Sequence, residues 1–79
     1  MRPGDMIRVN SSYLGKGLVR IYANELCDSW IRGARVNETL LVLSTETTDR
    51  FGHMILRVLC EDGIRWVYEL DWEVLDETR

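Results

Sequence analysis

Few residues of this chain have the types and spacing that catalysis needs. A serine or cysteine nucleophile requires a base within hydrogen-bond reach, and a third group must orient that base. The only histidine, His53, lies beside Gly52 in a stretch that reads as a surface turn. The Gly-Lys-Gly stretch at 15–17 is too short for a phosphate-binding loop, which places four residues between its first glycine and Gly-Lys-Ser/Thr. We therefore expect no catalytic residue and no enzyme activity.

Metal ligands are equally scarce. Cys27 and Cys60 stand far apart, and no Cys-x-x-Cys pair occurs. The acids at 61–62 and 71–77 lack the Asp-x-Asp-x-Asp-Gly order of a calcium loop, so we expect a solvated acidic edge without a metal or cofactor. No apolar run is long enough for a membrane span or a secretion signal, which favours a cytoplasmic protein. In that compartment both thiols are expected to be reduced and buried.

The net charge of −3 is unevenly distributed along the chain. Residues 1–60 carry eight arginines and lysines against six acids, and residues 61–79 carry two arginines against seven acids. We expect the basic part to neutralise the acidic end, within the fold or across a subunit interface. Nucleic-acid binding is disfavoured, because it usually needs clustered basic residues in a basic domain.

Short stretches of alternating apolar and polar residues predict half-buried β-strands. Ile7 and Val9 would face one side of the first strand, and residues 39–47 are apolar on both faces at their centre. Asp62-Gly63 is a strong hairpin signal, because a type I′ turn requires positive φ at both central residues. The expected strands are 6–9, 18–23, 39–47, 54–61, 64–69 and 73–76.

The connections are expected to be of three kinds. Polar and glycine-rich residues predict a long first loop at 10–17 and a hairpin turn at 48–53. Residues 24–38 show no clean period and are expected to form a long excursion, with one helical turn near 25–30. Residues 70–72 are expected to form a tight turn.

These elements predict one all-β domain, residues 1–79. Five or six short strands are too few for a sandwich, whereas a single, mostly antiparallel sheet curled into a barrel hides its edges and encloses one core. Outside the strand at 64–69, the expected core residues are Ile7, Val9, Val19, Ile21, Leu41, Leu43, Leu56, Val58 and Leu75.

The order of strands and turns resembles that of SH3-like barrels, in particular bacterial SH3-type domains. The pattern Gly63-x-x-Trp66-Val67, followed by Glu-Val-Leu at 73–75, is similar to the end of such a barrel, where a strand leads through a 3₁₀ turn to a short closing strand. With its Pro-Gly-Asp start, the order also resembles small proteins of tailed bacteriophages. Binary patterning would bury the face of Trp66, whereas the resemblance implies that Val67 lies in the core, and we follow the resemblance.

Surplus aromatic residues are the first candidate binding feature. The resemblance implies an aromatic platform between the long first loop and the end of the sheet. Trp30 could instead fold over the core, and Trp72 could close the open end of the barrel. The candidate partner-binding residues are Tyr13, Tyr22, Trp30, Trp66, Tyr68 and Trp72.

A second candidate feature is the stretch 4–21, which resembles the KOW element of ribosomal and transcription-factor barrels. In that element two strands and a short Gly-Lys loop contact RNA or polymerase. A nucleic-acid-binding barrel of this kind would use Arg8, Lys16, Arg20 and Arg32.

Together these features predict a non-enzymatic protein-interaction or structural module. Its partner would be another protein or a second copy of the chain, with no small-molecule substrate. The resemblance implies a bacteriophage virion or assembly component, or a modulator of a host protein. The alternative is the KOW-like barrel that binds nucleic acid or a transcription complex.

Overall fold

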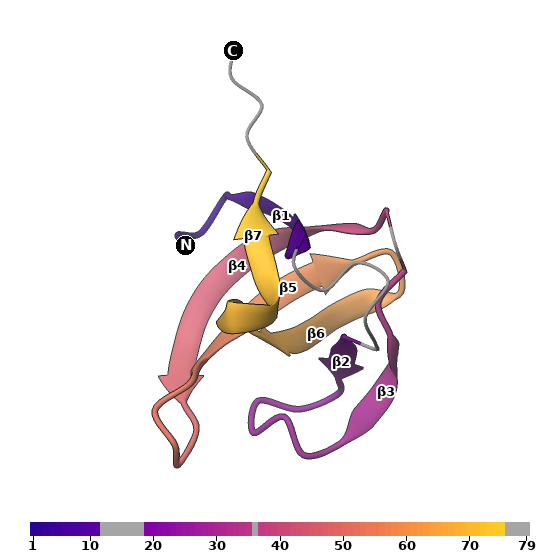
Figure 1. The fold of residues 1–79 in the computed structure, drawn as a ribbon. Coiled ribbons are helices and arrows are strands. Elements are labelled where there is room, and N and C mark those ends of the chain that lie inside the picture. Colours follow the sequence, from indigo (N-terminus) through magenta and orange to yellow (C-terminus); the bar gives the residue numbers. More distant parts are fainter. Residues whose placement is uncertain (12–18, 36, 76–79) are drawn as a thin grey trace.

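Seven short strands form one antiparallel sheet in the computed structural model, which describes residues 1–11, 19–35 and 37–75, without the side chains at 46 and 47. The strands follow the order β3-β2-β6-β5-β4-β1-β7 (Figure 1). These described residues contain no α-helix, and a 3₁₀ turn, η2 (Glu69–Asp71), precedes the last strand. The strands are β1 (Met6–Val9), β2 (Arg20–Tyr22), β3 (Trp30–Gly33), β4 (Thr39–Thr48), β5 (Met54–Cys60), β6 (Gly63–Tyr68) and β7 (Trp72–Val74).

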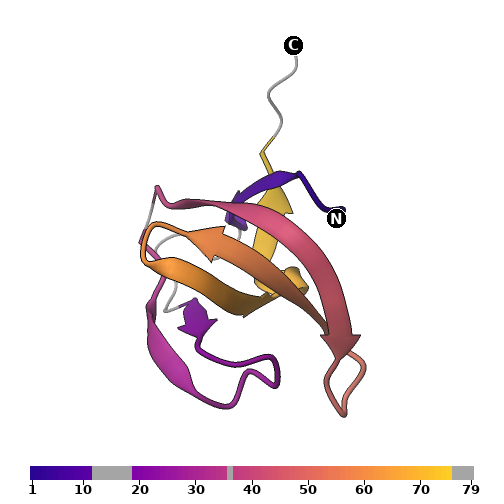
Figure 2. The same ribbon diagram turned by 180° about the vertical axis from the view of Figure 1, so that it is seen from behind.

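The sheet is curled around a single apolar core. Ile21 on β2 and Trp72 on β7 belong to the same buried cluster, although these strands lie near opposite ends of the sheet order. Figure 2 shows β4, β5 and β6 from behind, with β7 and η2 on their far side. The cluster consists of Ile7, Val9, Val19, Ile21, Leu40, Val42, Leu56, Val58, Cys60, Val67 and Trp72.

The prediction of an all-β, antiparallel fold is confirmed, but the excursion at 24–38 is corrected. Residues 30–33 form the additional strand β3, and no helix forms at 25–30, where the Cys27 N–H donates to the Asn24 carbonyl at 3.1 Å in a single turn. In the pairing with β2, Ile21 faces Arg32 and Tyr22 faces Trp30, so Ile31 is an extra residue in a β-bulge. A bulge interrupts the two-residue period of a strand, which explains why the sequence shows no clean alternation here.

The core prediction is wrong at three positions. Among the described side chains of β4, Leu40 and Val42 are buried, at 1% exposure each, whereas Leu41 and Leu43 are only partly buried. When a strand carries apolar residues on both faces, its sequence does not indicate which face is buried. Leu75 follows β7 and is also only partly buried. The other seven predicted core residues are buried as expected.

The hairpin between β5 and β6 lies where the sequence predicts it, but its turn type differs. Cys60 pairs with Gly63, so Glu61 and Asp62 are the two turn residues. Gly63 has a φ of +117°, as predicted, whereas the φ of Asp62 is not positive. The prediction of a type I′ turn is therefore wrong, and the residue with positive φ, Gly63, is the first residue of β6.

Ion pairs tie the acidic end of the chain to the rest of the fold, which confirms the expected internal neutralisation. Among the described residues, pairs that join residues 1–60 to residues 61–79 include Met1 N–Glu69 (3.2 Å), Arg8–Glu73 (2.9 Å), Arg32–Asp62 (3.2 Å) and Arg35–Glu61 (3.0 Å). No helix in the described part of the chain is long and apolar enough to cross a membrane.

Candidate functional site

Three aromatic residues lie in cross-strand register on the outer face of the sheet. Trp30 on β3 pairs with Tyr22 on β2, and Tyr22 pairs with Trp66 on β6. Paired residues of an antiparallel ladder point to the same face. Ile21 and Val67, which adjoin Tyr22 and Trp66 in the chain, are completely buried. Successive residues of a strand point to opposite faces, so the aromatic row faces away from the core.

Tyr68 extends this row along β6. It lies two residues after Trp66 and therefore on the same face, and its ring meets the ring of Tyr22 edge-on at 5.8 Å between centroids. The rings of His53 and Tyr68 also meet edge-on, at 6.1 Å between centroids, and the Phe51 ring lies 6.4 Å from that of His53. We call the side chains of Trp30, Tyr22, Trp66 and Tyr68 the aromatic face.

A groove of about 520 Å³ opens at the end of the aromatic face, between the β2–β3 loop and the β4–β5 turn. Figure 1 shows these two connections at the same end of the sheet. Ile55 and Tyr68 line the groove, together with Leu26 from the loop and Phe51 from the turn. Leu26 is 63% exposed and Phe51 is 72% exposed, so both offer apolar surface to a partner.

Asp49 fixes the shape of the turn that presents Phe51. Its carboxylate accepts hydrogen bonds from the backbone N–H groups of Phe51 (2.8 Å) and His53 (2.9 Å), and the His53 ring lies 3.5 Å away. Desolvation raises the pKa of Asp49, but these hydrogen bonds and one from the Tyr68 hydroxyl outweigh it and lower the pKa. The exposed position of Phe51 is therefore built into the turn.

The two cysteines are free and buried, as predicted. Cys27 lines the groove, and its φ of +54° lies in the left-handed region. Burial raises the pKa of the Cys27 thiol to about 12 and that of Cys60 to about 11. A thiol that stays protonated at neutral pH is a weak nucleophile, so both cysteines act as small apolar residues.

Arginine side chains lie within the aromatic face and next to it. The guanidinium of Arg20 lies over the Trp30 ring, 5.4 Å from its centroid. Arg57 on β5 pairs with Trp66 and therefore shares its face. Arg20 and Arg57 therefore place two positive charges on the aromatic face, whose rings are exposed at Trp30 and partly buried at Tyr22, Trp66 and Tyr68.

The other residues of the nucleic-acid alternative are engaged elsewhere or not described. Arg8 pairs with Glu73. Arg32 makes two hydrogen bonds to Glu38, at 2.9 and 2.7 Å, and also binds Asp62; these bonds raise the pKa of its guanidinium. Lys16 lies outside the described residues. Of that set, only Arg20 is placed on the aromatic face.

The structure separates the six aromatic candidates into three groups. Tyr22, Trp30, Trp66 and Tyr68 come together as the aromatic face, and the 53% exposure of Trp30 excludes a place in the core. Trp72 is only 2% exposed and belongs to the core, which agrees with the alternative that it closes the barrel instead of binding a partner. Tyr13 lies outside the described residues.

Two residues of the site were not identified from the sequence. Leu26 and Phe51 lie in connections 25 positions apart, and strand periodicity carries no information about loops. The one available signal was the predicted turn at 48–53, which implies that its apolar Phe51 is exposed.

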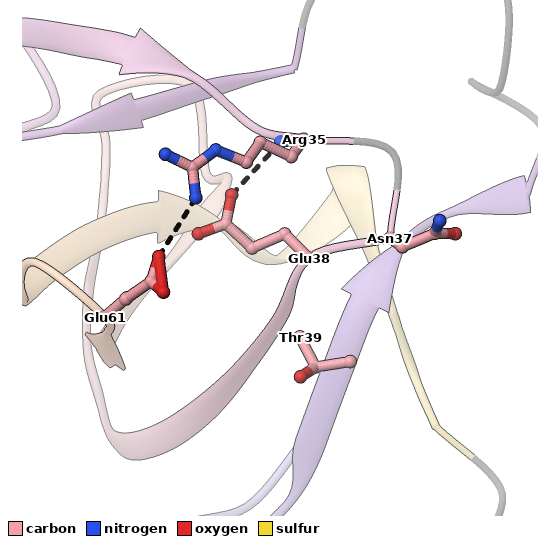
Figure 3. Close-up of a pocket in the computed structure, with 5 residues that line it drawn as sticks. All are labelled: Arg35, Asn37, Glu38, Thr39 and Glu61. Atoms are coloured by element: carbon pink, nitrogen blue, oxygen red, sulfur yellow. Dashed lines mark hydrogen bonds and ion pairs between the residues drawn. The ribbon is translucent and has the colours of Figure 1, made fainter.

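A separate polar hollow of about 480 Å³ lies at the β3–β4 connection and the end of β5 (Figure 3). Its charged groups mostly satisfy one another: Arg35 pairs with Glu61 at 3.0 Å, and the Arg35 N–H donates to Glu38 at 3.1 Å. The ion pair is exposed and contributes little stability. The lining residues are Arg35, Asn37, Glu38, Thr39 and Glu61.

Catalytic chemistry finds no support in the described residues. No three of their histidine, cysteine, aspartate or glutamate side chains are grouped to hold a metal ion. His53 and Asp49 approach each other, but Asp49 caps the turn and the nearby Cys27 thiol is held protonated by burial.

Comparison with protein-family models, curated proteins and solved structures found no match.

Proposed function

We propose that this chain is a non-enzymatic protein-interaction module that binds its partner through the aromatic face. One observation carries the proposal: Trp30, Tyr22 and Trp66 are aligned across three strands on the side of the sheet away from the core. The outer face of an antiparallel sheet normally carries polar residues. Tryptophan and tyrosine are enriched in protein interfaces and dominate their binding energy.

The size of the surface supports this proposal. A standard interface buries about 800 Å² on each partner, and an aromatic side chain buries about 150–250 Å² when it is fully covered. Four half-buried rings, with Leu26 and Phe51 at the groove, therefore supply a large share of such an interface. The partner is a different protein or a second copy of the chain.

We further propose an SH3-like barrel as the architecture. The curled antiparallel sheet and the 3₁₀ turn before the last strand support it. A role as a bacteriophage virion or assembly component, or as a modulator of a host protein, is supported by the resemblance in strand order alone. The identity of neighbouring genes tests that role: capsid, tail or replication genes beside this one would support it, and an unrelated operon would contradict it.

Nucleic-acid binding is the second candidate function. Arg20 over Trp30 is an arginine–aromatic pair of the kind on which unpaired bases stack. The net charge of −3 and the engagement of Arg8 and Arg32 by carboxylates count against it. Binding of labelled single- or double-stranded nucleic acid that weakens steeply with salt would favour this candidate over the first.

Site-specific photo-cross-linking tests the protein-binding proposal. The photoreactive amino acid p-benzoylphenylalanine replaces Trp30 in one variant and Val74 in another, in the cells that naturally produce the protein. Both positions are about half exposed, but Val74 lies on β7, at the opposite edge of the sheet order. We expect a protein adduct from position 30 and not from position 74. Equal adducts from both positions, or none from position 30, would contradict the proposal.

A further inference from the structure

The outer face of the β5–β6 hairpin is an apolar strip with one positive charge at its centre. On β5, positions 55, 57 and 59 pair with 68, 66 and 64 on β6, and of these Ile55 is buried, at 1% exposure. Leu59 is 44% exposed and its partner Ile64 is 38% exposed, which makes one end of the strip apolar. Tyr68 and the groove form the other end, where the lining of the groove also includes Asp28, Asp49 and Arg50. Arg57 lies between these two ends, beside Trp66.

Arg57 differs from four other arginines of the fold, and from Arg20, which lies over the Trp30 ring. Within the described side chains, no hydrogen bond or ion pair engages its guanidinium. By contrast Arg8, Arg32, Arg35 and Arg65 each lie within 4 Å of a carboxylate oxygen. Arg57 is already half-buried between Trp66 on β6 and Ser44 on β4. A partner that covers the strip would desolvate this guanidinium, which is unfavourable unless the partner supplies an anion.

We propose, resting on the proposed function above, that the partner presents an extended segment with a carboxylate flanked by apolar side chains two residues away on each side. The carboxylate would pair with Arg57, which can bind both of its oxygens. Side chains on one face of an extended segment repeat every two residues, about 6.6–6.8 Å apart, as do the outward positions of β5 and β6. One apolar side chain would lie over Leu59 and Ile64, and the other over Tyr68 at the groove.

An acidic peptide fits this strip better than a nucleic acid does. Within the described side chains, the strip offers one guanidinium without a hydrogen bond or ion pair, whereas a nucleic-acid strand presents a phosphate at every nucleotide and needs several cations. The protein as a whole carries a net charge of −3, which repels a polyanion but not a segment with a single carboxylate.

Selection from a display library of random heptapeptides tests the proposal. The library is selected in parallel against the wild-type chain and the Arg57→Glu variant. The wild type should enrich Asp or Glu with apolar residues two positions before and after it, and Arg57→Glu should enrich Lys or Arg at the central position. The best wild-type peptide should bind Arg57→Gln about tenfold more weakly than the wild type, by fluorescence anisotropy.

Matched variants make every outcome informative. Arg2→Glu changes the same charge at an exposed position before β1 and should leave the selected pattern unchanged. Near-UV dichroism establishes that each variant is folded, and Arg57→Gln replaces Arg57→Glu in the selection if the latter unfolds, with loss of the acidic preference expected. Apolar peptides without an acidic residue, bound in a Trp66-dependent manner, would overturn this proposal and leave the proposed function intact. No enrichment of any peptide would also overturn this proposal, whereas the proposed function is decided separately by the cross-linking experiment.

Discussion

The orientation of β6 decides whether Trp66 and Tyr68 face a partner or the core, and substituting Val67 tests it. Val67 lies between these two aromatic residues and is completely buried opposite Leu56 on β5. Val67→Ala should therefore destabilise the protein strongly. Val74→Ala is the matched control, because the same two methyl groups are removed from a side chain that is 46% exposed on the edge strand β7.

The expected magnitude follows from the burial of Val67. Removing two fully buried methyl groups costs about 1.6 kcal/mol of unfolding free energy at about 0.8 kcal/mol per group. The cavity that remains adds up to about 1 kcal/mol, so the total is about 2–3 kcal/mol. In a domain of this size each kcal/mol lowers Tm by about 4–8 °C, which predicts a decrease of about 8–24 °C. Val74→Ala should cost under about 1 kcal/mol.

Thermal and urea unfolding, followed by far-UV circular dichroism, measure both variants against the wild type. A lower urea midpoint with an unchanged m-value indicates lost stability, whereas a changed m-value indicates a change in the unfolded state. A Val67→Ala variant that melts with the wild type, or a Val74→Ala variant that is the less stable of the two, would mean that β6 is turned the other way. The aromatic face would then be part of the core.

Three further predictions concern the hairpin, the thiols and the pH dependence of stability. Gly63→Val should lower unfolding free energy by at least about 1–2 kcal/mol because the φ of +117° disfavours a side chain, and an unchanged urea midpoint would refute this. Mass spectrometry of the unreduced, denatured and alkylated protein should show two added groups, on Cys27 and Cys60; none would indicate a disulfide. Hydrogen bonds from Arg32 lower the pKa of Glu38, so the stability this carboxylate contributes is complete above its unfolded pKa near 4.5 and is lost as pH falls through the lower folded value. Between about pH 5 and about pH 3, the unfolding free energy of the wild type should therefore fall by more than that of the Glu38→Gln variant. Equal decreases in the two proteins would contradict this role of Glu38.

The strands that the sequence predicts well are those with one apolar face. Ile7 and Val9 alternate with polar or partly exposed neighbours, and both are buried as expected. The register of β4 could not be predicted in the same way, because Leu40, Leu41 and Val42 are all apolar and either face could be inside. Strand β3 was missed because the bulge at Ile31 breaks the alternation.

The candidate site was only partly predictable from the sequence. Ile64, Trp66 and Tyr68 alternate as a buried face would, and hydrophobicity alone assigns them to the core. Their exposure to the outside follows from the small interior of the sheet, which accommodates Val67 instead. The row from Trp30 through Tyr22 to Trp66 depends on pairings between residues distant in the chain. Such pairings are tertiary and leave no local signal in the sequence.

The most direct test of the central claim is a titration monitored by the three tryptophan indole N–H signals in a ¹H–¹⁵N spectrum. The probe is the acidic peptide selected by the wild-type chain, and a Trp→Phe variant at each position assigns its signal. Trp30 and Trp66 belong to the aromatic face, whereas Trp72 is buried in the core and serves as an internal reference. Binding through the aromatic face predicts that the signals of Trp30 and Trp66 shift with a common dissociation constant while that of Trp72 stays in place. A shift of Trp72 alone, or saturation without any change at Trp30 and Trp66, would contradict it.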